Sequence, residues 1–340
     1  MRDTTISQDH GTGAEATREL LAEYVLPRFG GNGEYDVDLA ALDDGAVFPV
    51  GDQSVVLTTD SHVVDPIEFP GGDIGRLAVS GTVNDLAVMG ATGPVTLTSS
   101  IIVEDGFDLD TLDRVFQSMA AACEEADCRI VAGDTKVMEG GDIDGLVLNT
   151  AGVGLVPVGE HVTDAGLAVG DRVIVSGTIG DHGIALLAAR DGMGFDEDLE
   201  SDVAPVNDLV ATAREAGAIS AMKDPTRGGL ATVLNEMAEK AGVGLEIEES
   251  AIPVTPGIEG AGEVLGIDPL EVANEGKVVF TAPEGEAEAV LDALQSHPQG
   301  RDAAIVGAVV EDHPGDVVMD TGVGRRFLSE PVSDPLPRIC

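Results

Sequence analysis

Apolar runs that resemble β-strands in composition alternate with helical patterns along most of this 340-residue chain. The strand-like runs are rich in Val, Ile, Leu and Thr, and they lie at 55–59, 94–103, 129–132, 146–156, 172–176, 244–247, 277–281 and 304–309. The helical patterns lie at 15–25, 74–89, 109–126, 182–190, 206–216 and 230–241. Such alternation predicts a layered α/β and α+β architecture, in which helices cover sheets.

The chain is long enough for two domains, each with its own core. Near residue 158 the residue pattern changes. Pro157 and Gly159 precede a polar stretch, and a new strand-like run begins at Arg172. Aromatic residues make up 3% of the sequence and Trp is absent, so Val, Leu, Ile and Ala must fill the cores. We expect an N-terminal domain over residues 1–157, a C-terminal domain over 158–330 and a tail over 331–340.

The tail contains three prolines, Pro331, Pro335 and Pro337, and it ends in Cys340. Proline removes an amide donor and fixes φ, so we expect an extended, mobile arm here and neither a helix nor a central strand. A thiol at the tip of such an arm is a candidate carrier of a covalent intermediate, because the thiolate is a nucleophile. The alternative is a frayed terminus that ends in cysteine by chance.

Cysteine usage and the N-terminal sequence predict a cytoplasmic protein. The three cysteines, Cys123, Cys128 and Cys340, have an odd count and no regular spacing, which argues against a disulfide framework or a zinc site. We expect Cys123 and Cys128 to be structural. The N-terminus has no apolar signal region and no run approaches about 18 apolar residues, so neither export nor membrane spanning is indicated.

The formal net charge is −44, from 18 Lys+Arg against 62 Asp+Glu. This excess opposes binding to nucleic acid, whose affinity comes largely from cationic contacts to phosphate. Two interpretations remain: an acidic interaction surface, or adaptation to a halophilic, high-salt environment in which ions screen self-repulsion. The acidic residues are scattered and Lys is rare, which favours salt adaptation.

Acidic residues recur beside the apolar runs. Asp60 and Asp134 follow strand-like runs, Asp44 precedes another, Asp85 lies in the helical pattern at 74–89, and Asp224 opens a glycine-rich loop. Mg²⁺ prefers carboxylate oxygens and commonly bridges them to nucleotide phosphates. These five carboxylates are therefore our candidate metal ligands. The alternative, that Asp follows strands because it favours turns, is strong for any single residue in so acidic a chain.

Phosphate-binding loops of the best-known kinds are absent, since no GxxxxGK[ST] sequence occurs and no GxGxxG opens a helix. Thr226-Arg227-Gly228-Gly229 instead precedes a helical pattern, where free amides attract phosphate and Arg227 can bind it bidentately. The glycines at 71–75 precede another helical pattern, so we expect the same of them.

Taken together, these segments resemble the HypE family of hydrogenase maturation factors, in order and over nearly the whole chain. The matching motifs include His10-Gly11-Thr12-Gly13, Thr59-Asp60-Ser61-His62, Phe69-Pro70-Gly71-Gly72-Asp73, Gly81-Thr82-Val83-Asn84-Asp85, Gly133-Asp134-Thr135-Lys136, Ser176-Gly177-Thr178-Ile179-Gly180-Asp181-His182, Asp224-Pro225-Thr226-Arg227-Gly228-Gly229, Asn274-Glu275-Gly276-Lys277 and Pro337-Arg338-Ile339-Cys340. The last motif is highly specific. Ala14 departs from the family's pattern, which has glycine at that position.

The resemblance implies a two-domain PurM-like ATP-binding fold with a flexible C-terminal tail, shared with aminoimidazole ribonucleotide synthetase, selenophosphate synthetase and thiamine-phosphate kinase. It implies a homodimer formed through the N-terminal domain. It also implies that HypF places a carbamoyl group on Cys340, and that ATP is used to dehydrate this thiocarbamate to a thiocyanate. The cyano group would then pass through a HypC–HypD complex to the iron of [NiFe] hydrogenase.

By the same resemblance, Glu275 is the expected base and Lys136 is expected to stabilise phosphate or orient the carboxamide. The expected ATP-binding residues are Asp44, Asp60, Asn84, Asp85, Asp134, Thr135, Asp224, Arg227 and Gly228, with Mg²⁺ held by the carboxylates. The roles of His10, His62 and His182 stay open. Two alternatives remain: a small-molecule phosphotransferase of the same fold, and a non-catalytic carrier that only presents Cys340.

Overall fold

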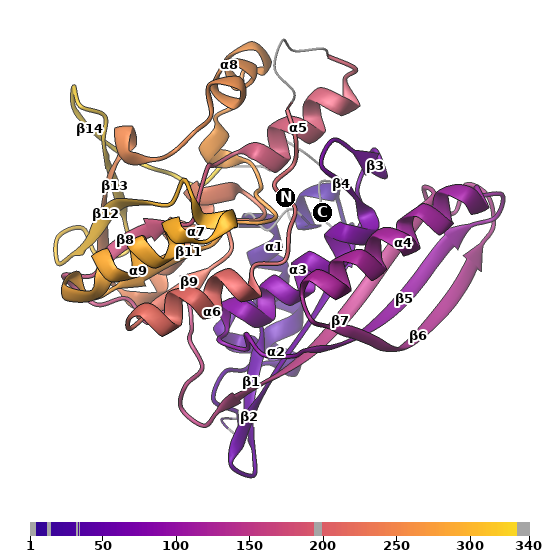
Figure 1. Ribbon diagram of the computed structural model, residues 1–340, viewed down its shortest axis with the longest axis horizontal. Coiled ribbons are helices and arrows are strands. Elements are labelled where there is room, and N and C mark those ends of the chain that lie inside the picture. Colours follow the sequence, from indigo (N-terminus) through magenta and orange to yellow (C-terminus); the bar gives the residue numbers. More distant parts are fainter. Residues whose placement is uncertain (1–4, 12–14, 32, 34, 194–198, 332–340) are drawn as a thin grey trace.

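The structure is a computed structural model that describes residues 5–11, 15–31, 33, 35–193 and 199–331 (Figure 1). Of the expected tail, only Pro331 belongs to the described residues. The prediction that Cys340 lies on a mobile arm therefore falls outside them.

The first half of the chain forms a five-stranded sheet of order β1-β2-β7-β5-β6. Its strands are β1 (Ala46–Val50), β2 (Gln53–His62), β5 (Thr96–Glu104), β6 (Arg129–Met138) and β7 (Leu146–Pro157). Helices α3 (Ile74–Val88) and α4 (Leu109–Glu125) cover one face. Helix α3 lies close to the sheet because Gly152 leaves room for it: a Cβ there would be 2.7 Å from side-chain atoms of both Thr82 and Leu86.

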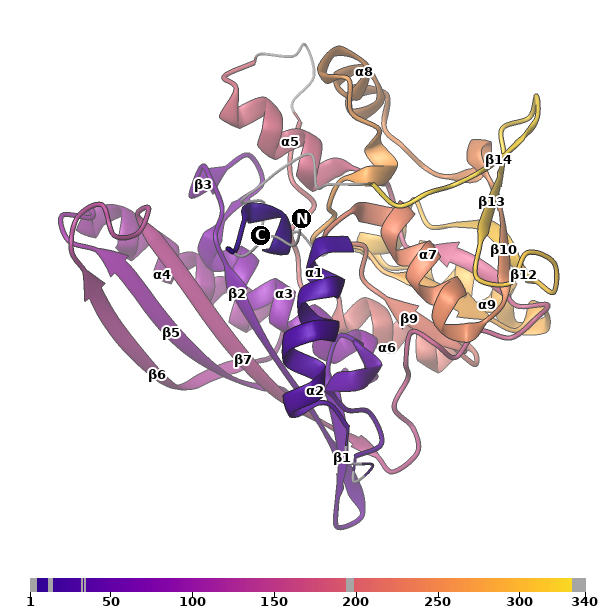
Figure 2. The same cartoon turned by 180° about the vertical axis from the view of Figure 1, so that it is seen from behind.

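The opposite face of this sheet carries no described helix over β5 and β6 (Figure 2). Alternate residues of a strand point to opposite faces, so β7 buries one set under α3 and exposes the other. In the exposed set, Val153 is 40% and Leu155 is 54% exposed, and Leu57 of β2 lies beside Val153 in the register. The face away from α3 and α4 is therefore open and partly apolar.

The second half forms a seven-stranded sheet of order β14-β13-β10-β12-β8-β11-β9. Its strands are β8 (Arg172–Val175), β9 (Ala221–Lys223), β10 (Gly244–Glu248), β11 (Val279–Ala282), β12 (Ala304–Val310), β13 (Val317–Asp320) and β14 (Arg325–Phe327). Helix α7 (Gly229–Ala241) packs on one face through Leu234 and Met237. Helices α6 (Asn207–Ala216) and α9 (Glu284–Ser296) pack on the other, against Phe280.

The two halves share part of one core. Ile184 of α5 (Asp181–Arg190) and Ile258 of α8 (Pro256–Leu265) belong to the same buried apolar cluster as Ile74 and Leu77 of α3. This packing fixes how the two sheets lie relative to each other. The short elements are α1 (Glu15–Leu20), α2 (Leu26–Phe29), β3 (Glu68–Phe69) and β4 (Gly72–Asp73), with a π-helical turn at Leu21–Val25 and 3₁₀ turns at Gln8–Gly11, Leu39–Ala41, Glu249–Ala251, Pro269–Glu271 and Pro298–Gly300.

The predicted α/β and α+β architecture is confirmed, and most predicted elements begin and end within a few residues of the observed ones. Five further elements, β9, α8, α9, β13 and β14, were not predicted from the sequence. The prediction that strands end before Asp60 and Asp134 was wrong, because these residues lie inside β2 and β6. Among the described residues, no helix has the length and apolar character needed to cross a membrane.

The two described cysteines are reduced. They meet at the end of α4, where Asp127 adopts a left-handed conformation and the Cys128 amide donates to the Cys123 carbonyl at 2.9 Å. This is the hydrogen bond of a Schellman motif, which also brings the side chains of its two ends together. Cys128 is buried and Cys123 is half-buried, in keeping with the structural role expected of them.

Candidate active site

Three carboxylates meet at the junction of the two halves. Asp44 lies just before β1, Asp85 lies on α3, and Asp224 directly follows β9. One oxygen of each lies within 4.8 Å of the others. The structure thus brings together three of the five carboxylates that the sequence singled out, from three separate elements.

Fixed partners orient these carboxylates. The Thr58 hydroxyl donates to Asp85 Oδ2 at 2.8 Å, and Lys223 Nζ donates to Asp44 Oδ1 at 2.9 Å. Asp44 Oδ2 and Asp224 Oδ2 are buried, with no hydrogen-bond partner among the described residues. An unpartnered carboxylate oxygen is costly in the interior, so these two atoms are suited to ligate a cation.

The electrostatics of this carboxylate cluster also fit a divalent cation. Burial, followed by repulsion from Asp44, raises the pKa of Asp224 to about 8. Burial and the charges of Asp224, Asp60 and Asp44 raise the pKa of Asp85 well above its usual range. Such groups resist ionising together unless positive charge lies between them. The residues present therefore fit Mg²⁺.

Asp60 extends this negative region from β2. Its Oδ2 lies 3.6 Å from Nε2 of His62, a fully buried side chain whose pKa is lowered by burial. The charge of Asp60 raises the pKa values of Asp85, Asp224 and Glu275. Asp60 is thus close enough to act on the cluster, although it is not one of the three residues whose oxygens converge.

Sequence reasoning missed the lysine network behind Asp44. Lys223 Nζ lies 3.1 Å from Asp164 Oδ2 and 3.7 Å from Glu236 Oε2, and Lys240 Nζ lies 2.5 Å from the same Asp164 oxygen. Burial opposes the charge of Lys223, but Asp44, Asp164 and Glu236 raise its pKa well above its usual value. The rarity of lysine was the available signal, because the chain has only four, at 136, 223, 240 and 277.

The glycine loop lies beside the cluster, at the N-terminus of α7. Gly228 and Gly229 both have positive φ, 71° and 61°, a backbone conformation that residues with a side chain rarely adopt. Arg227 acts electrostatically on both His62 and Glu275. A Cβ on Gly228 would also lie 3.5 Å from the ring of Pro331, so the tail begins next to this loop.

Glu275 lies between the two halves and is 3% exposed. Burial and then the charges of Asp224, Asp202 and Asp60 raise its pKa well above the usual range, while Arg227 lowers it. Its Oε1 has no hydrogen-bond partner among the described residues. Asn84 Nδ2 donates to the Glu275 carbonyl at 3.2 Å, which ties this second candidate to the same place.

Asp134, Thr135 and Lys136 do not join the cluster in the described part of this chain. Asp60 pairs across the sheet with Thr150, Thr150 with Ser99, and Ser99 with Gly133, so these four share the α3 face. Asp134 and Lys136 follow Gly133 along β6 and point to the opposite, open face, where their side chains form an ion pair at 2.5 Å. Alternation along β6 is the physical reason that the predicted metal ligand Asp134 is separated from the others.

The glycines at 71–75 do not form the phosphate site that we expected. Asp73 Oδ1 already accepts hydrogen bonds from the amides of Gly75, at 2.7 Å, and Arg76, at 2.9 Å. The start of α3 is therefore capped by its own carboxylate, whose negative charge opposes an incoming phosphate.

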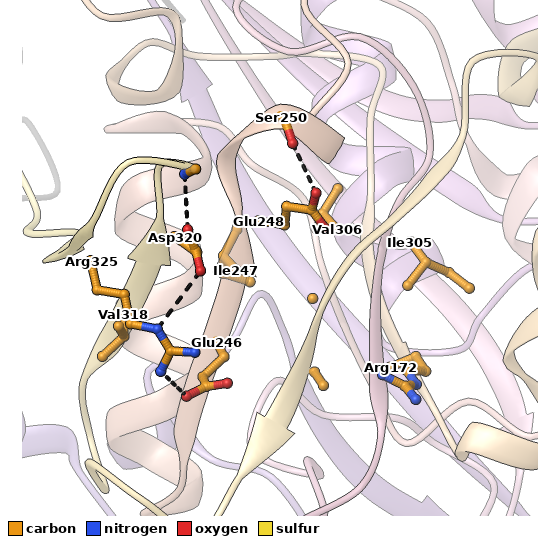
Figure 3. A pocket seen from close by; sticks show the side chains of 13 residues that line it. Arg172, Glu246, Ile247, Glu248, Ser250, Ile305, Val306, Val318, Asp320 and Arg325 are labelled. Carbon is orange, nitrogen blue, oxygen red and sulfur yellow. Dashed lines mark hydrogen bonds and ion pairs between the residues drawn. The ribbon is translucent and has the colours of Figure 1, made fainter.

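A cavity of about 550 Å³ lies elsewhere, on the C-terminal sheet (Figure 3). It is lined by parts of β8, β10, β12, β13 and β14, and among the described residues its lining includes none of the candidate site residues. Its charged side chains already have partners: Arg325 pairs with Glu246 at 2.9 Å and Asp320 at 3.7 Å, and Arg172 pairs with Glu284. We therefore assign the chemistry to the carboxylate cluster and not to this cavity.

Comparison with known proteins identifies two family models. The model described as AIR synthase related protein, N-terminal domain, matches residues 42–156, and its C-terminal counterpart matches residues 168–320. A carbamoyl dehydratase HypE from Bradyrhizobium diazoefficiens is 46% identical, with 100% of this chain and 97% of that protein covered. A carbamoyl dehydratase HypE from Escherichia coli K12 is 43% identical, with 97% and 98% covered.

Solved structures also identify HypE proteins as similar to this chain. A crystal structure of the hydrogenase maturation protein HypE in complex with ATP matches with a TM-score of 0.82 at 40% identity, and covers 99% of this chain and 100% of that one. HypE in a HypE–HypF complex matches with a TM-score of 0.85 at 42% identity, and covers 92% and 99%. A ThiL bound to AMPPCP and TMP, at 21% identity and a TM-score of 0.69, shows the shared fold alone.

Proposed function

This chain belongs to the HypE family of hydrogenase maturation proteins, and from that membership we propose that it uses ATP to dehydrate a carbamoyl group carried on the sulfur of Cys340. The product is a thiocyanate. HypF is the proposed carbamoyl donor, a HypC–HypD complex is the proposed acceptor of the cyano group, and the reaction is proposed to take place in the cytoplasm.

One observation supports this proposal best: the tail begins beside the glycine loop. The ring of Pro331 lies next to Gly228, and the nine residues after Pro331 can span about 30 Å when extended. We propose that this length lets Cys340 enter the site that holds Glu275 and also meet a partner outside. Access from outside is needed for loading, whereas dehydration requires water to be kept from the activated intermediate.

In the proposed reaction, the γ-phosphoryl group of ATP moves to the carbamoyl oxygen and ADP leaves. Phosphorylation of the oxygen removes one proton from nitrogen. The C–O bond then breaks, the second proton leaves with the phosphate as hydrogen phosphate, and a carbon–nitrogen triple bond forms. Glu275 is the proposed acceptor of a proton from nitrogen, because its raised pKa makes it a stronger base than an exposed carboxylate. Its unpartnered Oε1 is available for that proton.

The nucleotide site proposed here is the junction of the two halves. Arg227 and the amides beside Gly228 would bind phosphate oxygens, while Asn84 holds the surrounding backbone. Asp44, Asp85 and Asp224 would hold Mg²⁺, with Asp60 adding charge. Bound Mg²⁺ would supply positive charge that offsets both these carboxylates and the phosphates.

A homodimer formed through the open face of the N-terminal sheet is part of the proposal. Leu57, Val153 and Leu155 leave apolar surface exposed there, and a second copy of the chain would cover it. Asp134 and Lys136 project from that same face, away from their own carboxylate cluster. A part for Asp134 and Lys136 in the reaction therefore requires the second copy.

The mass of the C-terminal peptide tests the proposed function. After incubation with HypF, carbamoyl phosphate and ATP in molar KCl, the peptide that ends in Cys340 should gain a carbamoyl group and then lose one water. Glu275→Gln should gain the group and lose the water far more slowly. Gain without loss in the unchanged protein would instead indicate a carrier, and normal dehydration by Glu275→Gln would refute the role of that base.

The small-molecule phosphotransferase remains the weaker candidate. Selenophosphate synthetases usually carry a reactive cysteine or selenocysteine in an N-terminal glycine-rich loop, whereas this chain has no cysteine before Cys123. Its likeness to ThiL is one of fold only.

A further inference from the structure

Residues 201–206, which we call the junction segment, run between the two halves of the molecule. On the N-terminal side, the Ser201 amide donates to the Pro70 carbonyl at 2.9 Å and Arg76 Nε donates to the Val203 carbonyl at 2.7 Å. The Val206 amide donates to Asn84 Oδ1 at 2.8 Å. The segment is therefore attached along its length to the start of α3 and to α3 itself.

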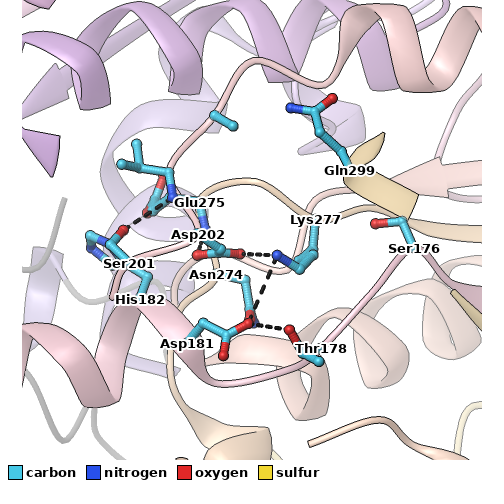
Figure 4. A network of polar contacts seen from close by, with 12 residues as sticks. Ser176, Thr178, Asp181, His182, Ser201, Asp202, Asn274, Glu275, Lys277 and Gln299 are labelled. Carbon is cyan, nitrogen blue, oxygen red and sulfur yellow. Dashed lines mark hydrogen bonds and ion pairs between the residues drawn. The ribbon is translucent and has the colours of Figure 1, made fainter. Parts of the chain in front are cut away.

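On its other side the junction segment holds Glu275 (Figure 4). Asp202 Oδ1 accepts from the Glu275 amide at 3.0 Å, and the Ala204 amide donates to the Glu275 carbonyl at 3.2 Å. Both hydrogen-bonding groups of the Glu275 main chain are thus bound by this one segment. The second Asp202 oxygen accepts from Lys277 Nζ at 3.1 Å, so a single carboxylate fixes the chain on both sides of Gly276.

Glycines make room for this arrangement. A Cβ on Gly276 would collide with the Asp202 carbonyl oxygen, and one on Gly71 would lie 2.6 Å from the Ser201 carbonyl oxygen. A Cβ on Gly72 would lie 2.6 Å from a methyl group of Val203. These glycines belong to two motifs that the sequence singled out, and their place in the fold is to admit the junction segment.

We propose that Asp202 is a positioning residue for the dehydration step, because it holds the main chain of Glu275 so that the buried carboxylate faces the carboxylate cluster. This inference rests on the proposed function, in which Glu275 is the base. Asp202 itself is buried against Lys277, with 4% of its side chain exposed, and is not proposed to touch substrate.

The charge of Asp202 is needed as well as its shape. Lys277 is one of only four lysines in the chain, and its ammonium lies 3.1 Å from Asp202 and 3.8 Å from Asp181. An asparagine at 202 could still accept from the Glu275 amide through its oxygen. Its NH2 group would then face the Lys277 ammonium, donor against donor, and Lys277 would lose this acceptor. Asp181 provides a matched control, because it contacts the same lysine from α5, whereas the Glu275 main chain is bound by Asp202 and Ala204.

The test is single-turnover dehydration of protein already carbamoylated on Cys340, started with ATP. Asp202→Ala should slow the loss of water about 100-fold, the scale on which small displacements of a reacting group act. Asp202→Asn should slow it about 10-fold, and Asp181→Asn should stay within about 2-fold. The KM for ATP and the extent of carbamoylation should not change, since Asp202 is proposed to act only through Glu275.

A double variant separates positioning from general damage to the structure. If Asp202 acts through Glu275, then Asp202→Ala combined with Glu275→Gln should be no slower than Glu275→Gln alone. A further 100-fold loss in the double variant, or dehydration by Asp202→Ala within 2-fold of the unchanged protein, would overturn this inference only. If the unchanged protein keeps its carbamoyl group without losing water, the proposed function is overturned together with it.

Discussion

Asp224 shows how one residue can make the site dependent on a cation. It is buried beside Asp44 and Asp85, and its Oδ2 has no hydrogen-bond partner among the described residues. Burial and repulsion raise its pKa to about 8, and burial with the charges of Asp44 and Asp164 raises the pKa of Asp43 to about 7. In the metal-free protein near neutral pH, Asp224 therefore keeps its proton for most of the time and Asp43 for about half of it.

We predict that the metal-free protein loses stability as the pH rises. An unfolded Asp ionises near pH 4, so a folded Asp with a raised pKa stabilises the protein fully below about pH 4 and loses that contribution as the pH rises through about 8. Through Asp224 alone, the free energy of unfolding should fall by up to about 1.4 kcal/mol for each pH unit within that window. Chemical denaturation between pH 4 and 9, in molar KCl with a chelator, would measure it.

Adding Mg²⁺ should flatten this dependence, because the cation stabilises the ionised carboxylates. Asp224→Asn should flatten it without Mg²⁺, since asparagine does not titrate. Asp312→Asn, on the surface, is the matched control and should leave the slope unchanged. A metal-free protein that is equally stable at pH 5 and pH 8 would contradict the assignment of the cluster.

At the level of the element, the alternation of residues along a strand decides which residues share the site. Sequence patterns predicted most strands and helices, the glycine loop, and three carboxylates that do meet. They could not predict that Asp134 and Lys136 lie on the face of the sheet opposite to Asp60, because pairing between distant strands sets that register. Asp202 and Lys223 escaped notice for a similar reason, since their contacts join segments far apart in the chain.

The open face of the N-terminal sheet leads to a prediction about the dimer. Val153→Glu would place a charge at the centre of this apolar face, opposite Leu57 and Thr96, and we expect the variant to be monomeric. Light scattering coupled to gel filtration in molar KCl would give the mass. Val323→Glu, at a fully exposed position beside β14, is the control and should stay dimeric. A Val153→Glu protein that remains a dimer would place the interface elsewhere.

At the scale of the whole molecule, charge sets the conditions under which the fold persists. With 62 acidic and 18 basic residues, the surface repels itself unless ions screen it. The two halves meet through polar contacts at the site, such as Lys223 with Asp44 and Val206 with Asn84, as well as through the core shared by α3, α5 and α8. Repulsion should therefore loosen the molecule as a unit when salt is removed.

We predict a loss of secondary structure at low ionic strength. Circular dichroism should report the folded protein in molar KCl and progressive loss as the salt is dialysed away. Sucrose at matched osmolarity should not restore the signal, because it does not screen charge. An unchanged spectrum after complete desalting would refute the salt-adaptation hypothesis.

The scarcity of lysine has a practical consequence for chemical labelling. All four ammonium groups lie in ion pairs, but they differ in exposure. The side chains of Lys223, Lys240 and Lys277 are at most 22% exposed, whereas 64% of the Lys136 side chain is exposed in the single chain. Amine-selective acylating reagents should therefore modify Lys136 before any other lysine. A fluorophore attached in this way would report directly on whatever approaches that strand.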